Sequence, residues 1–344
     1  MVPGATTADR IVAPTDAGRS RMGLGFLGTP PVPRMVELAQ AAEAAGFASV
    51  WVAETRLRRD GITAVAAIAV ATRRVSVATG LVNVYTRGPV LLAQTAATLA
   101  ELSGGRFALG VGAGSAEILR AQGIAPDRPF TRLREYVDVL RPLLVGQTVE
   151  YEGRVVRVRG ARLEVVPPVP PPLYLGVTGP RGLRLAGRVA DGVLLDAFVP
   201  MAYIQRAAEV VQAAAGETGR GRVDIAGIVM TAIAENGATA RERMRAAIAR
   251  YYTLFPTIAA VSGLSPDEVE RLQRVTRQEG PRAGGRYLSD ALVDAVCLAG
   301  TPEECRRGLQ RFRAAGLDLP VLMTPDDPAD LLEAFGQNAT SGEG

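Results

Sequence analysis

The feature that most limits the possible folds is a regular alternation of short β-type runs with helical runs from Met22 onward. Most helical runs end in a glycine just before the next strand, as in the helix-to-strand loops of α/β proteins. Eight strands are expected, at 22–28, 48–54, 75–82, 106–112, 173–176, 192–197, 223–234 and 319–325. Eight such units favour a closed (β/α)8 TIM barrel over an open doubly wound sheet.

Two segments interrupt this alternation and are predicted to be insertions into a single barrel domain that covers residues 22–336. The first, near 123–172, contains a helical run, a hairpin pattern and a proline cluster. The second, 256–290, is polar and helical, with a helix-start signal of the type Ser-Pro-Asp-Glu. Residues 1–21 and 337–344 are expected to be flexible tails.

The composition limits the chemistry, because the 344-residue chain contains no histidine. Without imidazole the chain cannot supply a Ser-His-Asp triad, an HExxH zinc site or a histidine ligand to iron, and we predict no metal site. The net charge is +4 and the arginines are scattered, which argues against nucleic acid binding. Cys297 and Cys305 are the only cysteines, a pattern typical of a reducing compartment.

No apolar run approaches the roughly 18 residues that a membrane helix needs, and the first residues lack the apolar core of a signal peptide. We therefore expect a cytoplasmic protein that does not enter a membrane. Its expected partner is a small-molecule substrate.

In a barrel of parallel strands, functional residues follow the carboxyl ends of the strands. These positions are mostly small, hydroxylic or glycine, and they comprise Gly28, Glu54-Thr55, Asn83, Ala113-Gly114-Ser115, Thr178-Gly179-Pro180 and Asp196. Backbone amides and hydroxyls of this kind suit a large planar or phosphorylated ligand. Only Glu54 and Asp196 are carboxylates, which disfavours glycoside hydrolysis.

Two glycine-containing segments allow either a binding or a structural interpretation. The run from Gly110 to Gly114 lacks the last glycine of a dinucleotide fingerprint and equally suits a tight strand end. Residues 176–182, GVTGPRG, follow a strand and open a helix, so that free amides could seat an anion there. A plain strand-to-helix turn explains the same spacing equally well.

Several segments together resemble the luciferase-like flavin and deazaflavin oxidoreductases. They are VYTRGP, GGRFALGVGAG, VEYEGRVV and LYLGVTGPRGLRLAGRVADGVLLDA, and the resemblance runs in the same order over about 22–325. Within that superfamily the chain is most similar to the methylenetetrahydromethanopterin reductases, which use coenzyme F420. The resemblance implies a luciferase-like (β/α)8 barrel and a homodimer. It also implies an 8-hydroxy-5-deazaflavin at the strand ends, with a hydride moving to or from its C5 carbon.

The resemblance also assigns cofactor contacts. The non-prolyl cis peptide that supports the ring in the family corresponds to Gly80-Leu81, and Glu54 lies where relatives have an acidic group near the ring. The other implied contacts are Leu81, Val82, Asn83, Ala113, Gly114 and Ser115 around the ring, and Thr178, Gly179, Arg181 and Gly182 on the phosphate side. Arg87 belongs to a T-x-R-x-P loop of the family, where a functional role and a structural tie to the barrel are equally supported.

The chain departs from the family at its usual proton donors. Thr55 replaces a histidine that many relatives carry after the second strand, while Gly25 and Ser115 stand where relatives place glutamates. These replacements argue against a methanopterin or a sugar phosphate substrate. They leave Glu54, Thr55, Tyr85 or water as the predicted catalytic proton donor.

The leading expectation is a reductase in which reduced F420 delivers a hydride to a C=C or C=N bond of a small molecule. The first alternative is an FMN-dependent luciferase-like monooxygenase, which the missing histidine disfavours. The second is a barrel without catalysis that binds a cofactor or serves as a scaffold.

Overall fold

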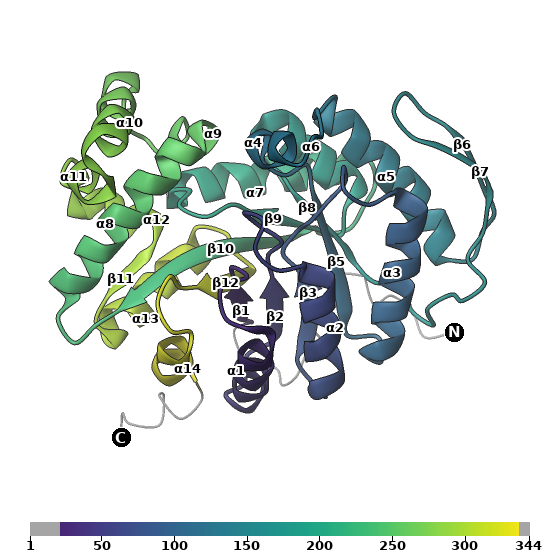
Figure 1. Cartoon of the computed structure of the whole chain (residues 1–344), viewed down its shortest axis with the longest axis horizontal. Coiled ribbons are helices and arrows are strands. Elements are labelled where there is room, and N and C mark those ends of the chain that lie inside the picture. The colour runs from purple at the N-terminus through teal and green to yellow at the C-terminus, as the bar shows by residue number, and fades with distance from the viewer. Residues whose placement is uncertain (1–20, 337–344) are drawn as a thin grey trace. The chain divides into compact units, whose positions relative to one another are not determined.

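A computed structural model describes residues 21–336 of the chain (Figure 1). The two predicted tails lie outside this range, except for Arg21, whose guanidinium forms an ion pair with the buried Asp224 at 2.7 Å. The fold comprises two compact units. Unit 1 contains the residues up to Leu194 together with Val210–Asp224, and unit 2 contains the remainder.

Unit 1 is built on parallel strands in the sheet order β1-β2-β3-β5-β8-β9. They are β1 (Gly23–Phe26), β2 (Ser49–Val52), β3 (Ser76–Thr79), β5 (Phe107–Gly112), β8 (Leu173–Gly176) and β9 (Gly192–Leu195), whose last residue opens unit 2. Nearly all of their residues are buried, as expected for parallel strands that are covered on both faces.

Six helices accompany these strands in unit 1. They are α1 (Val32–Ala44), α2 (Gly61–Ala71), α3 (Pro89–Leu102), α4 (Ala116–Ala121), α5 (Pro129–Leu144) and α6 (Pro180–Val189). Proline at the first position favours the start of α3, α5 and α6, because its fixed φ suits a helix and no amide hydrogen is lost. Asp60 caps α2 by accepting a hydrogen bond from the Thr63 amide at 2.6 Å.

The first predicted insertion contains the expected hairpin, β6 (Val149–Glu152) and β7 (Arg157–Ala161), which pair antiparallel. The buried carboxylate of Glu135 in α5 accepts three backbone hydrogen bonds from residues 154–156 at 2.7–3.0 Å. Burial of the carboxylate raises the pKa of Glu135, but these hydrogen bonds outweigh that effect and hold the pKa below its ordinary value. One side chain therefore fixes the hairpin turn to α5.

In unit 2, β10 (Asp224–Ile233) lies between β11 (Leu298–Gly300) and β12 (Leu319–Met323) and runs parallel to both. Its main helices are α8 (Gly237–Leu254), α12 (Asp290–Val296), α13 (Pro302–Ala314) and α14 (Ala329–Phe335), and α7 (Met201–Gly216) joins the two units. The second insertion forms α9 (Pro256–Ala259), α10 (Pro266–Glu279) and α11 (Pro281–Gly285). The predicted helix-start signal is a capping box at Ser265 and Glu268.

The strands β1, β2, β3, β5, β8, β9, β10 and β12 alternate with helices along the chain and are parallel to their partners, which confirms the predicted (β/α)8 class. Among residues 21–336, no helix combines the length and apolarity needed to cross a membrane. Both cysteines are free thiols and are buried in unit 2.

Candidate functional site

A bend after β3 places the Leu81 side chain among three glycines of unit 1. The Gly80-Leu81 peptide bond is cis, as the resemblance predicted. A Cβ added at Gly176 would lie 1.8 Å from Leu81 Cδ1, and one at Gly110 or Gly112 would lie 2.9 Å from a Leu81 methyl carbon. The glycines of β5 and β8 therefore leave a recess that the Leu81 side chain fills, and any side chain at these positions would close it. We call this recess the glycine cradle.

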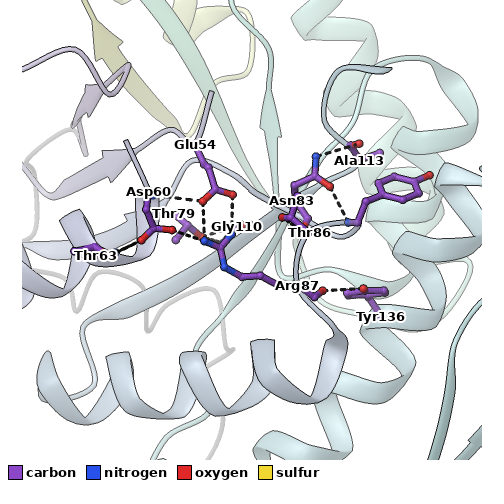
Figure 2. Close-up of polar contacts among 12 residues, drawn as sticks. Glu54, Asp60, Thr63, Thr79, Asn83, Thr86, Arg87, Gly110, Ala113 and Tyr136 are labelled. Carbon is purple, nitrogen blue, oxygen red and sulfur yellow. Dashed lines mark hydrogen bonds and ion pairs between the residues drawn. The ribbon is translucent and has the colours of Figure 1, made fainter. Parts of the chain in front are cut away.

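Asn83, at the end of β4 (Val82–Asn83), joins two strand-end loops (Figure 2). Its Oδ1 accepts a hydrogen bond from the Tyr85 amide at 2.7 Å, and its Nδ2 donates to the Ala113 carbonyl at 3.5 Å. Gly114 has a φ of 67°, and a Cβ there would lie 1.9 Å from Asn83 Nδ2. Both the backbone conformation and the available space therefore require glycine at 114. Three predicted cofactor contacts, Asn83, Ala113 and Gly114, thus lie together.

Glu54, which follows β2, forms a bidentate ion pair with Arg87 of the loop before α3 (Figure 2). The two N–O distances are 2.7 and 2.8 Å, and the side chains are 21% and 18% exposed. Arg87 also pairs with Asp60, the cap of α2. The hydrogen bond from Arg87 to Glu54 is the main reason that the pKa of Arg87 is raised. Of the two roles considered for Arg87, this geometry favours the tie between the loop and the barrel.

Tyr85, a predicted proton donor, has its hydroxyl engaged. The hydroxyl donates to the Asp127 carbonyl at 2.5 Å, and the Arg132 guanidinium covers the Tyr85 ring at 4.6 Å. Burial raises the pKa of Tyr85. Tyr85 therefore links the loop after β4 to the loop before α5, a role for which the sequence carries no signal.

Three strand-end hydroxyls, those of Thr55, Ser115 and Thr178, are partly exposed and make no hydrogen bond to another side chain or backbone group between residues 21 and 336. Thr178 precedes Gly179, whose φ is 88° and around which a Cβ would meet open space. These positions can therefore receive polar atoms of a ligand.

Two further predicted contacts lie in α6 and differ in character. Arg181 is exposed and lies 5.6 Å from the Phe130 ring, so its charge is available at the helix start. Gly182 is buried, and a Cβ there would lie 2.8 Å from Val177 Cβ. Gly182 thus permits α6 to pack closely against the segment that follows β8.

Unit 2 holds a second strand-end carboxylate, Asp196, to which the sequence analysis assigned no role. Asp196 accepts hydrogen bonds from the Tyr251 hydroxyl of α8 and from the Ala197 amide. Burial nevertheless raises the pKa of Asp196. Tyr251 lies between the rings of Phe198 and Phe255, with centroid distances of 5.2 and 4.4 Å. This aromatic contact fixes the phenol that faces the carboxyl group.

The fold and the strand-end cradle define a luciferase-like barrel, and comparison with known proteins agrees. Residues 10–319 match the model of the luciferase-like monooxygenase family, so the chain belongs to that family. It is 28% identical over 310 residues to a 5,10-methylenetetrahydromethanopterin reductase of Methanolobus tindarius, covering 89% of this chain and 94% of the relative. It is 37% identical over 172 residues to an F420-dependent glucose-6-phosphate dehydrogenase of Nakamurella multipartita, covering 46% and 51%.

Among solved structures, the coenzyme F420-dependent tetrahydromethanopterin reductase of Methanopyrus kandleri superposes with a TM-score of 0.82. The superposition covers 93% of this chain and 98% of that one at 24% sequence identity. These relatives confirm the resemblance to the superfamily and to its methylenetetrahydromethanopterin reductase branch.

Proposed function

We propose that the chain is a coenzyme F420-dependent reductase that delivers a hydride from the reduced deazaflavin to a C=C or C=N bond of a small molecule. The observation that carries this proposal is the glycine cradle, in which Leu81 occupies the space beside Gly110, Gly112 and Gly176. The solved reductase structure that matches 93% of this chain is named as coenzyme F420-dependent, which supports the choice of cofactor.

The donor set fits a deazaflavin. Leu81 and Val82 offer an apolar support for a flat ring, while Asn83 orders the loop beside it. The amide of Gly114 is not covered by a side chain of its own residue, so it can approach polar atoms closely. Hydroxyls for the polar edge come from Thr55, Ser115 and Thr178, and Arg181 supplies the cation for a phosphate. When bound, the deazaflavin provides the carbon that gives or accepts the hydride.

The reduction also requires a proton. Among the predicted donors, both Glu54 oxygens accept hydrogen bonds from Arg87 and the Tyr85 hydroxyl donates to Asp127, whereas Thr55 keeps an available but weakly acidic hydroxyl. Of the predicted donors, Thr55 and water therefore remain available as the source of the proton. We propose that Thr55, or a water molecule beside its hydroxyl, supplies the proton.

We further propose that the protein is a cytoplasmic homodimer. Support comes from apolar side chains on adjacent helices α2 and α3, because Val70 and Leu91 are 57% and 56% exposed and Leu102 is 44% exposed. The free, buried thiols suit a reducing compartment. Sedimentation velocity measures the oligomeric state directly.

The proposed function is tested by titrating the purified protein with F420 and with FMN and following cofactor fluorescence. Tight binding of F420 with weak binding of FMN is expected; the reverse order would assign an FMN-dependent monooxygenase. Binding of neither would indicate a barrel without redox function. Gly114→Ala is expected to weaken F420 binding at least tenfold, whereas Gly216→Ala, with open space around its Cβ, serves as the matched control.

A further inference from the structure

The strand-end carboxyl group of Asp196 in unit 2 has one oxygen that the chain leaves without a partner. The hydrogen bonds from the Tyr251 hydroxyl and the Ala197 amide both end on Oδ1. Oδ2 accepts no hydrogen bond from any residue between 21 and 336, and it is not sealed off from solvent. Because Asp196 is partly exposed, Oδ2 can be reached by a hydrogen-bond donor from outside the chain.

The same carboxyl group also lacks a counter-charge. In unit 1, the buried carboxylates of Asp191 and Asp224 both pair with arginine, at N–O distances of 2.7–3.1 Å. Asp196 forms no ion pair with a basic side chain in the part of the chain that the structure describes. Most of the group is nonetheless buried, which raises its pKa. The ionised form of Asp196 would therefore be stabilised by a cation that the chain itself does not supply.

Tyr251, whose hydroxyl meets Asp196, belongs to a row of three aromatic rings. Tyr251 and Phe255 are partly exposed, with ring centroids 4.4 Å apart, whereas Phe198 is buried. Phe198 has a φ of 60°, a backbone conformation that a bulky residue rarely adopts. Its carbonyl accepts a hydrogen bond at 2.8 Å from the hydroxyl of the buried Tyr252, which holds this turn after β9 in place. Strained turns that their surroundings enforce are concentrated at ligand sites.

We propose that Asp196 and the rings of Tyr251 and Phe255 form a binding site for a small organic cation that carries a protonated nitrogen. An N–H of this cation donates to Oδ2, and such a charge-assisted hydrogen bond is stronger than one between neutral groups. The partly exposed ring faces attract the same positive charge through their π electrons. Asp196 follows a barrel strand, the position at which barrels of this class place their ligand-binding residues. All three residues lie in unit 2, so the inference goes beyond the proposed function and does not depend on the cofactor.

The test measures the binding of benzylammonium and of benzyl alcohol, its neutral isostere, by isothermal titration calorimetry at neutral pH without added cofactor. The wild-type protein is expected to bind the ammonium about tenfold more tightly, as for one charge-assisted hydrogen bond. Asp196→Asn keeps the shape of the side chain and removes its charge, so it should abolish this preference. Phe255→Leu removes a ring and leaves the carboxyl group in place, so it should weaken ammonium binding about two- to fivefold.

The matched control is Asp267→Asn, which removes the same charge from an exposed position in the first turn of α10, also in unit 2. It is expected to keep the preference for the ammonium. Equal binding of the two probes by the wild-type protein, binding of neither, or an equal loss in the control overturns the site. If Asp196→Asn does not fold, unchanged ammonium binding by Phe255→Leu overturns it as well. These outcomes are separate from the F420 titration, because they are measured without cofactor.

Discussion

At the scale of single residues, the most demanding feature is the fit of Leu81 into the glycine cradle. A methyl group at Gly176 would lie 1.8 Å from Leu81 Cδ1, which is far closer than two carbon atoms in contact can approach. Close packing means that such an overlap must be relieved by moving Leu81 or the end of β8. The position of Leu81 is thus decided by residues on two other strands.

Gly176→Ala is therefore expected to lower the free energy of unfolding by about 1–3 kcal/mol, measured by urea denaturation. Adding Leu81→Ala should recover part of this loss, because it removes the methyl carbons that the new Cβ meets. Gly216→Ala, where a Cβ meets nothing within 4 Å, should not destabilise the protein. A Gly176→Ala protein as stable as wild type would contradict this packing.

The Glu54–Arg87 pair is expected to contribute to stability rather than to proton transfer. Neutralising it by Glu54→Gln should cost about 1–3 kcal/mol, because both partners are largely buried and doubly hydrogen bonded. A double-mutant cycle of unfolding free energies with Arg87→Gln isolates this interaction. An unchanged hydride-transfer rate with intact cofactor binding would remove Glu54 from the mechanism, whereas a large rate loss would restore it as a donor.

Asp196 is expected to make the stability of the protein depend on pH. Burial raises its pKa in the folded protein, so the free energy of unfolding should fall as pH rises from the ordinary value of 3.8 through the folded-state pKa. Asp196→Asn should remove this decline, which urea denaturation at several pH values measures. Tyr251→Phe removes a hydrogen bond that favours the ionised form, so it should steepen the decline. The same pH dependence in Asp196→Asn and wild type would contradict this role of burial.

At the scale of secondary structure, strands of four residues such as β1 and β2 could be predicted, because they recur in a regular alternation with helices, whereas short elements outside that alternation could not. The eight expected strands did not include β11, because three residues are too few to show a period. Strand ends could be predicted as a class, so Asn83, Ala113 and Gly114 were found. Their partners could not, since the Tyr85–Asp127 hydrogen bond joins loops 42 residues apart without a motif.

The hairpin β6–β7 is expected to be held to α5 in a pH-dependent way. The pKa of Glu135 is lowered from its ordinary value of 4.5, so its stabilising effect is complete above that value and is lost as pH falls through the lower, folded-state pKa. Glu135→Gln should therefore lose about 1–3 kcal/mol at pH 7 and show a weaker decline towards pH 3. Hydrogen exchange at residues 154–156 reports the release; equal protection in variant and wild type would refute it.

At the scale of the whole molecule, the presence of two compact units raises the question of whether residues 22–336 unfold as the single domain that was predicted. Each unit contains its own reporter of unfolding. Trp51, the single tryptophan, is buried in unit 1, whereas Cys297 and Cys305 are buried in unit 2. Burial also raises the pKa of Cys305 to about 12, so its thiol should be unreactive until unit 2 opens.

If the chain is one cooperative domain, urea unfolding followed by Trp51 fluorescence and by thiol labelling should give coincident transitions. A Cys297→Ala/Cys305→Ala protein, which should not be labelled at any urea concentration, controls for reaction at other groups. Two separated midpoints would show instead that the units unfold independently.

The glycine cradle also constrains how this chain can change over generations. A side chain at 112 or 176 would meet mainly Leu81, so the effect of a substitution there depends on which residue occupies position 81; a Cβ at Gly110 would also lie 2.1 Å from the Thr79 carbonyl oxygen. Leu81 must therefore be shortened before Gly112 or Gly176 can vary, whereas Gly110 is held by the backbone of β3 in either case. The order in which these positions can change is therefore restricted, and this restriction preserves the cradle.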